Sequence, residues 1–333
     1  MKCNSFILLS LLDICMAQRW KLNGCDAFNK DQIKGAISEA VTMAGTALDV
    51  LKNNFQDEKV QLMVKHILGD DQQLQGKVDR AKGEPDSPAV RLQLFGNVNK
   101  YDKDESPFLG APFIENTDLL IFCTNSNYEP SGAHTRNKAI GSLIPDEAAH
   151  VVDLCYNGIP APNTELPMAI TMSSDGLDNT KWKAAMDDWK NKGGQGNPPD
   201  MAPYIVPRPT KPNTMDLCTW YLNTLGGDGF LSIDDATIAK VQEQAFLEKL
   251  TGNNKAIDAL VQSLAGTFGH ELTHTNLGGK TVDNPATTGC YGWVCVGNLH
   301  DVNNADSIAQ LGVCMHLFKK GFWVDADGKV QKI

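Results

Sequence analysis

Residues 266–283, GTFGHELTHTNLGGKTVD, indicate what this chain is built around. They contain the pattern His-Glu-x-x-His at His270, Glu271 and His274. On a helix, side chains four positions apart lie on the same face, so the two imidazoles can reach one metal ion. The carboxylate of Glu271 then faces the open coordination position, where it can take a proton from water. The pattern is typical of zinc hydrolases.

The residues around the motif favour a metal site over a chance copy on a solvated helix. The preceding stretch 256–269, AIDALVQSLAGTFG, places apolar side chains close to one helical face. The pair Gly278-Gly279 can end that helix and turn the chain back. The apolar residues are Ile257, Leu260, Val261, Leu264 and Phe268.

Two histidines do not complete such a site, because catalytic zinc usually has three protein ligands. Asp283, His300 and Asp306 are the downstream candidates. We favour Asp283, since it follows the glycine turn closely and a carboxylate suits zinc. An Asp in this place can also simply cap a turn.

The N-terminus predicts secretion. Residues 1–17, MKCNSFILLSLLDICMA, combine an early Lys2, a short apolar run and a small-x-small cleavage pattern, as signal peptides do. We therefore expect an extracellular protein whose residues 18–333 form one domain. The expected N-terminal lobe is about 18–225 and the catalytic helical lobe about 226–333.

Charge and hydropathy exclude several partner classes. The formal net charge is −10 and there is no basic run, so nucleic acid and anionic membranes are not expected partners. No stretch after the signal peptide is long and apolar enough to cross a membrane. We expect a monomer acting on protein or peptide substrates.

The cysteines predict a stapled fold. Of the 9 cysteines, Cys3 and Cys15 lie in the expected signal peptide, and the others should form mostly disulfides with one left over. Cys290 and Cys295 are near enough to close a small loop, while the pairing stays open. The other mature cysteines are Cys25, Cys123, Cys155, Cys218 and Cys314.

The hydrophobic pattern predicts an α+β fold with helices dominating the C-terminal half. Residues 173–213 look like a surface insertion, either an inert loop or a substrate-facing flap. Helices are expected at 29–52, within 56–81, and at about 232–249, 254–275 and 303–318. Strands are expected at Val90–Phe95, Leu119–Cys123 and Val151–Cys155.

Four short strings in order, HELTH, GGKTVD, CYGW and NNADS, resemble the deuterolysin-type metallopeptidases, or aspzincins, and their secreted fungal relatives. The strong part of the match covers about 260–318. The resemblance implies a zincin-like fold, which we expect to combine a mainly helical catalytic half with a small antiparallel sheet and disulfides. It also implies one bound Zn²⁺.

Residue by residue, the resemblance implies His270, His274 and Asp283 as zinc ligands and Glu271 as general base. Tyr291 looks like the family tyrosine that hydrogen-bonds the developing oxyanion. Its spacing departs from the compact members, which place that tyrosine three residues after the ligand Asp, whereas here it follows eight residues after. From the residues alone, Tyr291 can instead be a packing residue.

Asp306 resembles the aspartate that lines the pocket for a basic residue after the cut in lysine-preferring members. Ala309 stands where strict members carry a Glu, so strict lysine specificity is not implied. Two other roles are open for Asp306: capping its helix, or hydrogen bonding to a metal-bound histidine.

The sequence therefore predicts a secreted zinc endopeptidase in which Glu271 is the base. The alternative is a secreted zinc-binding protein or effector that does not cut peptides. The intact Glu271 favours the first hypothesis.

Overall fold

The computed structural model describes the greater part of the chain. Its described residues are 19–82, 95, 98, 101, 103–104, 118–132, 134–144, 146–159, 166–193, 204–208, 210–225, 229–276, 278–284 and 289–333. The expected signal peptide, 1–17, and residues 90–94 of one predicted strand lie outside these ranges. In the described part, no helix is long and apolar enough to cross a membrane.

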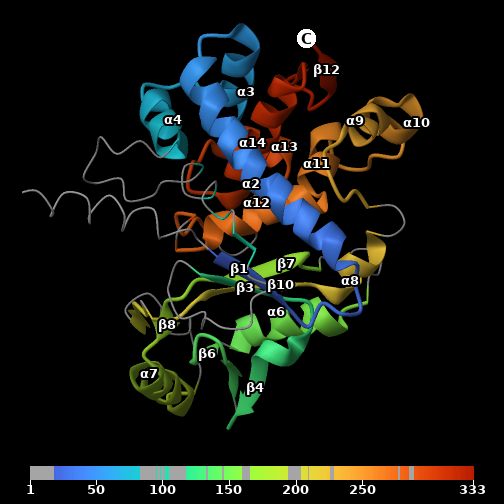
Figure 1. The fold of residues 1–333 in the computed structure, drawn as a ribbon. Coiled ribbons are helices and arrows are strands. Elements are labelled where there is room, and N and C mark those ends of the chain that lie inside the picture. Colours follow the sequence, from blue (N-terminus) through green and yellow to red (C-terminus); the bar gives the residue numbers. More distant parts are fainter. Residues whose placement is uncertain are drawn as a thin grey trace, which may run out of the picture.

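A five-stranded sheet forms the middle layer (Figure 1). Its pairs β2–β1, β1–β3 and β3–β10 are parallel, and the pair β10–β7 is antiparallel. The central strands are the most buried, as expected for a sheet covered on both faces. In order, the strands are β2 (Lys103–Asp104), β1 (Arg19–Asn23), β3 (Leu119–Phe122), β10 (Asn213–Leu217) and β7 (Ala169–Met172).

The prediction of a small antiparallel sheet is therefore only partly correct. The sheet of β4 (Tyr128–Ser131), β5 (His134–Asn137) and β6 (Ser142–Ile144) fits it, but the largest sheet is mixed. Parallel neighbours need long crossover connections. Here the helices α2 (Lys30–Asn53), α3 (Glu58–Leu68) and α4 (Leu74–Lys82) lie between β1 and β3 in the chain, and no local pattern reveals that pairing.

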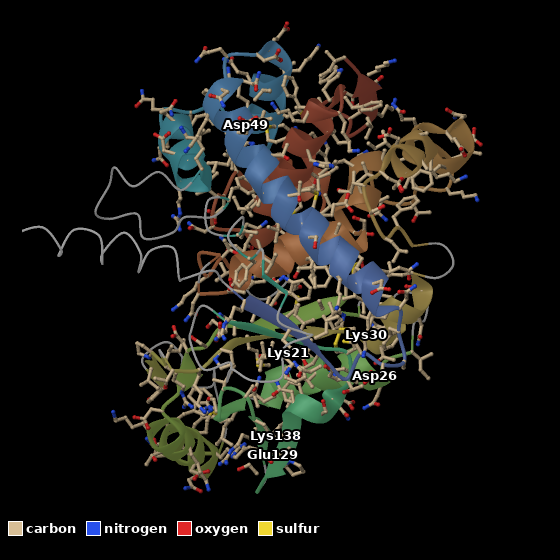
Figure 2. The ribbon with its side chains drawn as sticks, viewed as in Figure 1. Lys21, Asp26, Lys30, Asp49, Glu129 and Lys138 are labelled. Atoms are coloured by element: carbon tan, nitrogen blue, oxygen red, sulfur yellow. A yellow bond between two sulfur atoms is a disulfide. The ribbon has the colours of Figure 1, made fainter. Side chains whose placement is uncertain are left out.

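Helices from both ends of the chain cover one face of this sheet (Figure 1). Helix α2 packs against α12 and α14, so the helical layer draws on both sides of residue 225. Asn29 caps α2 by accepting from the backbone N–H groups of Asp31 and Gln32 at 3.2 Å, and Asp26 pairs with Lys30 in its first turn (Figure 2). The helices are α2 (Lys30–Asn53), α3 (Glu58–Leu68), α4 (Leu74–Lys82), α9 (Asp235–Gln242), α10 (Gln244–Leu247), α11 (Ala256–Val261), α12 (Leu264–His274), α13 (Trp293–Leu299) and α14 (Ala305–Lys319).

The predicted helix 254–275 is divided into two. Helix α11 ends at Val261, and α12 begins at Leu264. The hydroxyl of Ser263 accepts from the backbone N–H of Gly266 at 3.1 Å, which caps a new helix. The division lets α12 run in its own direction between α2 and the sheet.

The other face of the sheet carries a smaller lobe (Figure 1). The predicted strand Val151–Cys155 is wrong, since these residues belong to α6. Val152 and Cys155 are buried while Val151 and Asp153 are exposed, which is a helical spacing.

The remaining elements of the whole structure are η1 (Asn125–Asn127), α6 (Asp146–Asn157), β8 (Gly176–Leu177), α7 (Asn179–Asn191), β9 (Ile205–Val206), α8 (Thr219–Thr224), β11 (Phe322–Val324) and β12 (Val330–Lys332).

Three disulfides confirm the expected staples. Cys25–Cys123 and Cys155–Cys218 each fasten the end of a sheet strand, and Cys290–Cys295 closes the small loop. Cys314 is the leftover thiol among the described residues, and it is buried. Such bonds are typical of proteins from oxidising compartments.

Removing the long-range disulfide should cost more stability than removing the short one. The Cys25–Cys123 bond closes a separation of 98 residues and Cys290–Cys295 one of 5. On loop-entropy grounds, alanine at both ends should lower the free energy of unfolding by about 4–5 kcal/mol for the first and about 2 kcal/mol for the second. Urea unfolding of the two double variants checks this order, and equal losses would contradict it.

A buried carboxylate should make stability depend on pH. Asp216 of β10 is fully buried and accepts hydrogen bonds from the hydroxyls of Tyr128 and Tyr156, both at 2.5 Å. Burial is the main cause that raises the pKa of Asp216 from 3.8 to about 7. The folded state then keeps a proton that the unfolded chain releases. The resulting contribution to the free energy of unfolding is fully present below about pH 4 and is lost as the pH rises to about 7.

Asp216→Asn should remove that dependence. The difference in unfolding free energy between the wild type and the variant should shrink from about pH 4 to about pH 7, on the order of a few kcal/mol. Chemical unfolding across this range measures it, and Asp188→Asn on the exposed surface of α7 is the control. A constant difference would show that Asp216 is charged in the folded state throughout.

Candidate metal centre

Helix α12 places both histidines of the motif on one face. The Nε2 atoms of His270 and His274 are 3.2 Å apart, and each side chain is mostly buried. Glu271 lies between them in the chain and is 6% exposed. The predicted helical placement of the motif is thus present.

A tight turn brings the chain back after α12. The carbonyl of Thr275 accepts from the backbone N–H of Lys280 at 3.0 Å, and Thr281 donates its N–H to the Thr273 carbonyl at 3.1 Å. A Cβ at Gly278 would lie 1.8 Å from the Leu272 carbonyl oxygen, so only glycine fits there. The turn returns the following residues to the two imidazoles.

The same turn orients one imidazole. His274 Nδ1 lies 2.7 Å from the Thr281 carbonyl oxygen, and only a protonated Nδ1 can donate to a carbonyl. That tautomer leaves the Nε2 lone pair of His274 facing the site. No sequence pattern pointed to Thr281, because its contribution is a backbone atom.

The turn is also fastened to the sheet. Asn213 of β10 accepts through Oδ1 from the backbone N–H groups of Asn276, at 3.0 Å, and Ser174, at 3.1 Å. Lys280 forms an ion pair with Asp175, the residue after Ser174. The residues after α12 are therefore fixed from two sides.

Asp283 completes a three-residue group. Its Oδ1 atom lies 3.2 Å from His270 Nε2 and 3.6 Å from His274 Nε2. With the 3.2 Å between the two nitrogens, these separations match the edges of a tetrahedron, about 3.3 Å for ligand bonds of about 2.0–2.1 Å. Among the described residues this group of ligand atoms converges within 4.8 Å, and it can hold a metal ion.

The electrostatics of the group also fit a metal. Burial alone lowers the pKa of His270, but the carboxylates of Asp283 and Asp306 outweigh it and raise the pKa well above 6.5. Burial raises the pKa of Asp283, but His270 and His274 bring it down to about 2. Asp283 Oδ1 is buried yet makes no hydrogen bond of good geometry. A cation would satisfy it and displace the His270 proton.

Asp306 lies behind His270. Its side chain is buried in the first turn of α14, with Oδ1 3.7 Å from His270 Nδ1. Its Oδ2 accepts from the backbone N–H of Gly292 at 2.7 Å. Asp306 therefore lies at ion-pair distance from a proposed ligand, and the pocket role that the resemblance implies for it stays a prediction.

Tyr291 stands at the rim of the group. It is 57% exposed, and its ring centroid is 6.0 Å from that of His270. Partial burial, together with the neighbouring carboxylate of Asp283, raises the pKa of Tyr291. Trp293, in contrast, is buried, and its ring stacks on that of His66 with 4.0 Å between the ring centroids. Trp293 is therefore a packing residue, whereas Tyr291 lies at the surface.

Asn304 joins the two segments that carry Asp283 and Tyr291. Its Oδ1 accepts from the backbone N–H of Asn284 at 3.0 Å, and its Nδ2 donates to the Cys290 carbonyl at 3.1 Å. The residue is fully buried. Its place in the string NNADS was the available signal, but the pattern did not reveal which segments it joins.

His300, a candidate third ligand, lies elsewhere. It ends α13 in a left-handed conformation, and its side chain faces Gly69 after α3. The structure therefore brings together His270, Glu271, His274, Asp283, Tyr291 and Asp306 from the prediction, and leaves out His300.

Comparisons of the chain with protein-family models, with curated proteins and with solved structures find no match. The likeness to deuterolysin-type metallopeptidases thus stays a hypothesis based on four short strings.

Loss of the Asp306 carboxylate should weaken metal binding without removing a ligand. Asp306→Asn should reduce the affinity for Zn²⁺ about 10- to 100-fold, because partners of ligating histidines set their orientation and basicity. Asp283→Ala, which removes a ligand, should reduce it further. Competition with a chelating dye measures both, with Asp188→Asn as control. Unchanged affinity in Asp306→Asn would show that its contact with His270 is incidental.

Proposed function

We propose that this protein is a secreted zinc-dependent endopeptidase. The observation that carries the proposal is the buried carboxylate of Glu271 on the helix that supplies two members of a His-His-Asp group. A metal that only stabilised a fold would need neither an adjacent acid nor an open position.

Zinc suits the donor set better than the hard cations. Two imidazoles and one carboxylate are ligands that Zn²⁺ prefers, whereas Ca²⁺ and Mg²⁺ favour all-oxygen sites. His270, His274 and Asp283 would hold the ion. When bound, zinc supplies Lewis acidity, which lowers the pKa of water and polarises a carbonyl group.

Glu271 would handle the protons of the reaction. Its carboxylate accepts a proton from the attacking water and passes it to the nitrogen of the departing amine. Being almost fully buried, it is held away from competing bulk water. Tyr291, exposed at the rim, would donate a hydrogen bond to the oxyanion as it develops.

The sheet beside α12 supports a peptide as substrate. Strand β7 contacts α12 and, among the described strands, pairs only with β10. Its other edge would offer backbone groups to an extended chain, as in recognition by strand addition. The proposed substrates are extended peptides, and a preference for basic residues after the cut, which the resemblance implies through Asp306, stays a prediction.

A second candidate is a secreted zinc-binding protein without peptidase activity. It is favoured by one observation: Tyr291 lies beside the proposed ligand Asp283, whose carboxylate raises the pKa of the tyrosine and would compete with an oxyanion for its hydroxyl. The disulfides suit secretion under either hypothesis. Activity measurements separate the two.

Glu271→Gln should abolish most turnover while leaving the metal in place. The amide keeps the size of the side chain but cannot act as a base, so cleavage should fall by about 100-fold or more. Cleavage of casein or a peptide library and metal content per chain are measured on the same preparations. If the variant cleaves as fast as the wild type, the proposed role of Glu271 is wrong. If the zinc-loaded wild type cleaves nothing, the second candidate stands.

A further inference from the structure

A cavity lies in the smaller lobe, between helix α7 and the sheet of β4, β5 and β6. Its volume is about 460 Å³. Helix α7 lines it with Thr180, Lys183, Ala184 and Asp187, whose spacing of three and four places them on one helical face. The cavity thus forms along the length of this helix.

The facing wall is one side of the small sheet. His134 and Arg136 alternate along β5, so both point to the same side. Ser131 stands opposite His134 and Leu143 opposite Arg136 in the strand register, and opposed residues share a face. The wall is therefore a regular surface of two adjacent strand pairs.

The cavity is not a fault in the packing of α7. Trp182 and Met186 are buried on another side of the helix, where they pack with Trp189 and Tyr204. That cluster holds the helix in place. The residues that α7 turns toward the cavity are mainly polar or charged, so the cavity is not a gap in an apolar core.

The charge of the lining runs against that of the chain. Two cations, Arg136 and Lys183, face a single acid, Asp187, although the chain as a whole carries −10. Glu129 opposes Arg136 in the register but does not line the cavity. A recess lined by basic groups concentrates anions.

One donor in this wall has nothing to bind. Arg136 Nε is buried and has no hydrogen-bond partner among the described residues. Leaving a buried charged donor unsatisfied is unfavourable, and a shift of the Arg136 side chain that exposes Nε to an oxygen acceptor in the cavity would relieve it. Guanidinium groups match planar or tetrahedral oxyanions with paired hydrogen bonds.

We propose that this cavity binds an oxyanion, a carboxylate or a phosphate, carried by a small organic molecule. Arg136 and Lys183 would hold the charged group, and Ser131 and Thr180 add hydroxyl donors. Leu143 and Ala184 provide apolar surface for the rest of the molecule. The site is separate from the His-His-Asp group and does not depend on the proposed peptidase function.

Calorimetric titration tests the proposal with two probes, inorganic phosphate and an acetylated, amidated tripeptide with a central glutamate. At least one should bind the wild type saturably. Arg136→Gln should weaken that binding about tenfold or more, because charge-assisted hydrogen bonds are lost. Lys183→Gln should weaken it roughly twofold to fivefold. The probe that binds identifies the source of the oxyanion.

The matched control is Lys138→Gln. Lys138 follows β5, is exposed, and lies outside the cavity lining (Figure 2). It removes the same charge and should leave the affinity unchanged. Lys183 is exposed on α7, so its variant keeps the fold even if Arg136→Gln does not. Absence of binding by both probes overturns the proposal. So does equal binding to the wild type and Lys183→Gln with folded Arg136→Gln also unaffected, which would place the anion elsewhere.

Discussion

The hydrogen bond between His274 Nδ1 and the Thr281 carbonyl joins the end of α12 to the segment that carries Asp283. It fixes the tautomer of one imidazole and, at the same time, the position of Asp283, the third proposed ligand. Gly278 lets the turn pass close to the Leu272 carbonyl oxygen, and Asn304 accepts a hydrogen bond from Asn284 at the end of the returning segment. The geometry of the candidate centre therefore depends on the hydrogen bond between His274 and Thr281.

The sequence anticipated those parts of the molecule that depend on local spacing. Helix α2 and the face of α12 follow from apolar periodicity, and the convergence of Asp283 follows from a turn of few residues. Parallel pairing of β1 with β3 was not accessible, because it depends on segments about a hundred residues apart. The place of Asp306 was open for a similar reason, since the packing of α14 decides which side of His270 it meets.

The two layers around the sheet divide the chemistry of the protein. The helical layer supplies the His-His-Asp group, and α14 within it is buried along most of its length. The smaller lobe supplies the basic cavity between α7 and β4–β6. Asn276 donates a hydrogen bond to Ser174, and Lys280 forms an ion pair with Asp175, both just before β8. These two contacts join the turn after α12 to the smaller lobe.

The buried thiol of Cys314 gives this fold an internal reporter. It lies near the middle of α14 with no exposed surface, and burial raises its pKa, so the reactive thiolate is suppressed while the helix stays packed. With the other described cysteines held in disulfides, a thiol reagent labels the described part of the folded chain only when α14 separates from its neighbours. The labelling rate then counts the openings of the helix that carries Asp306.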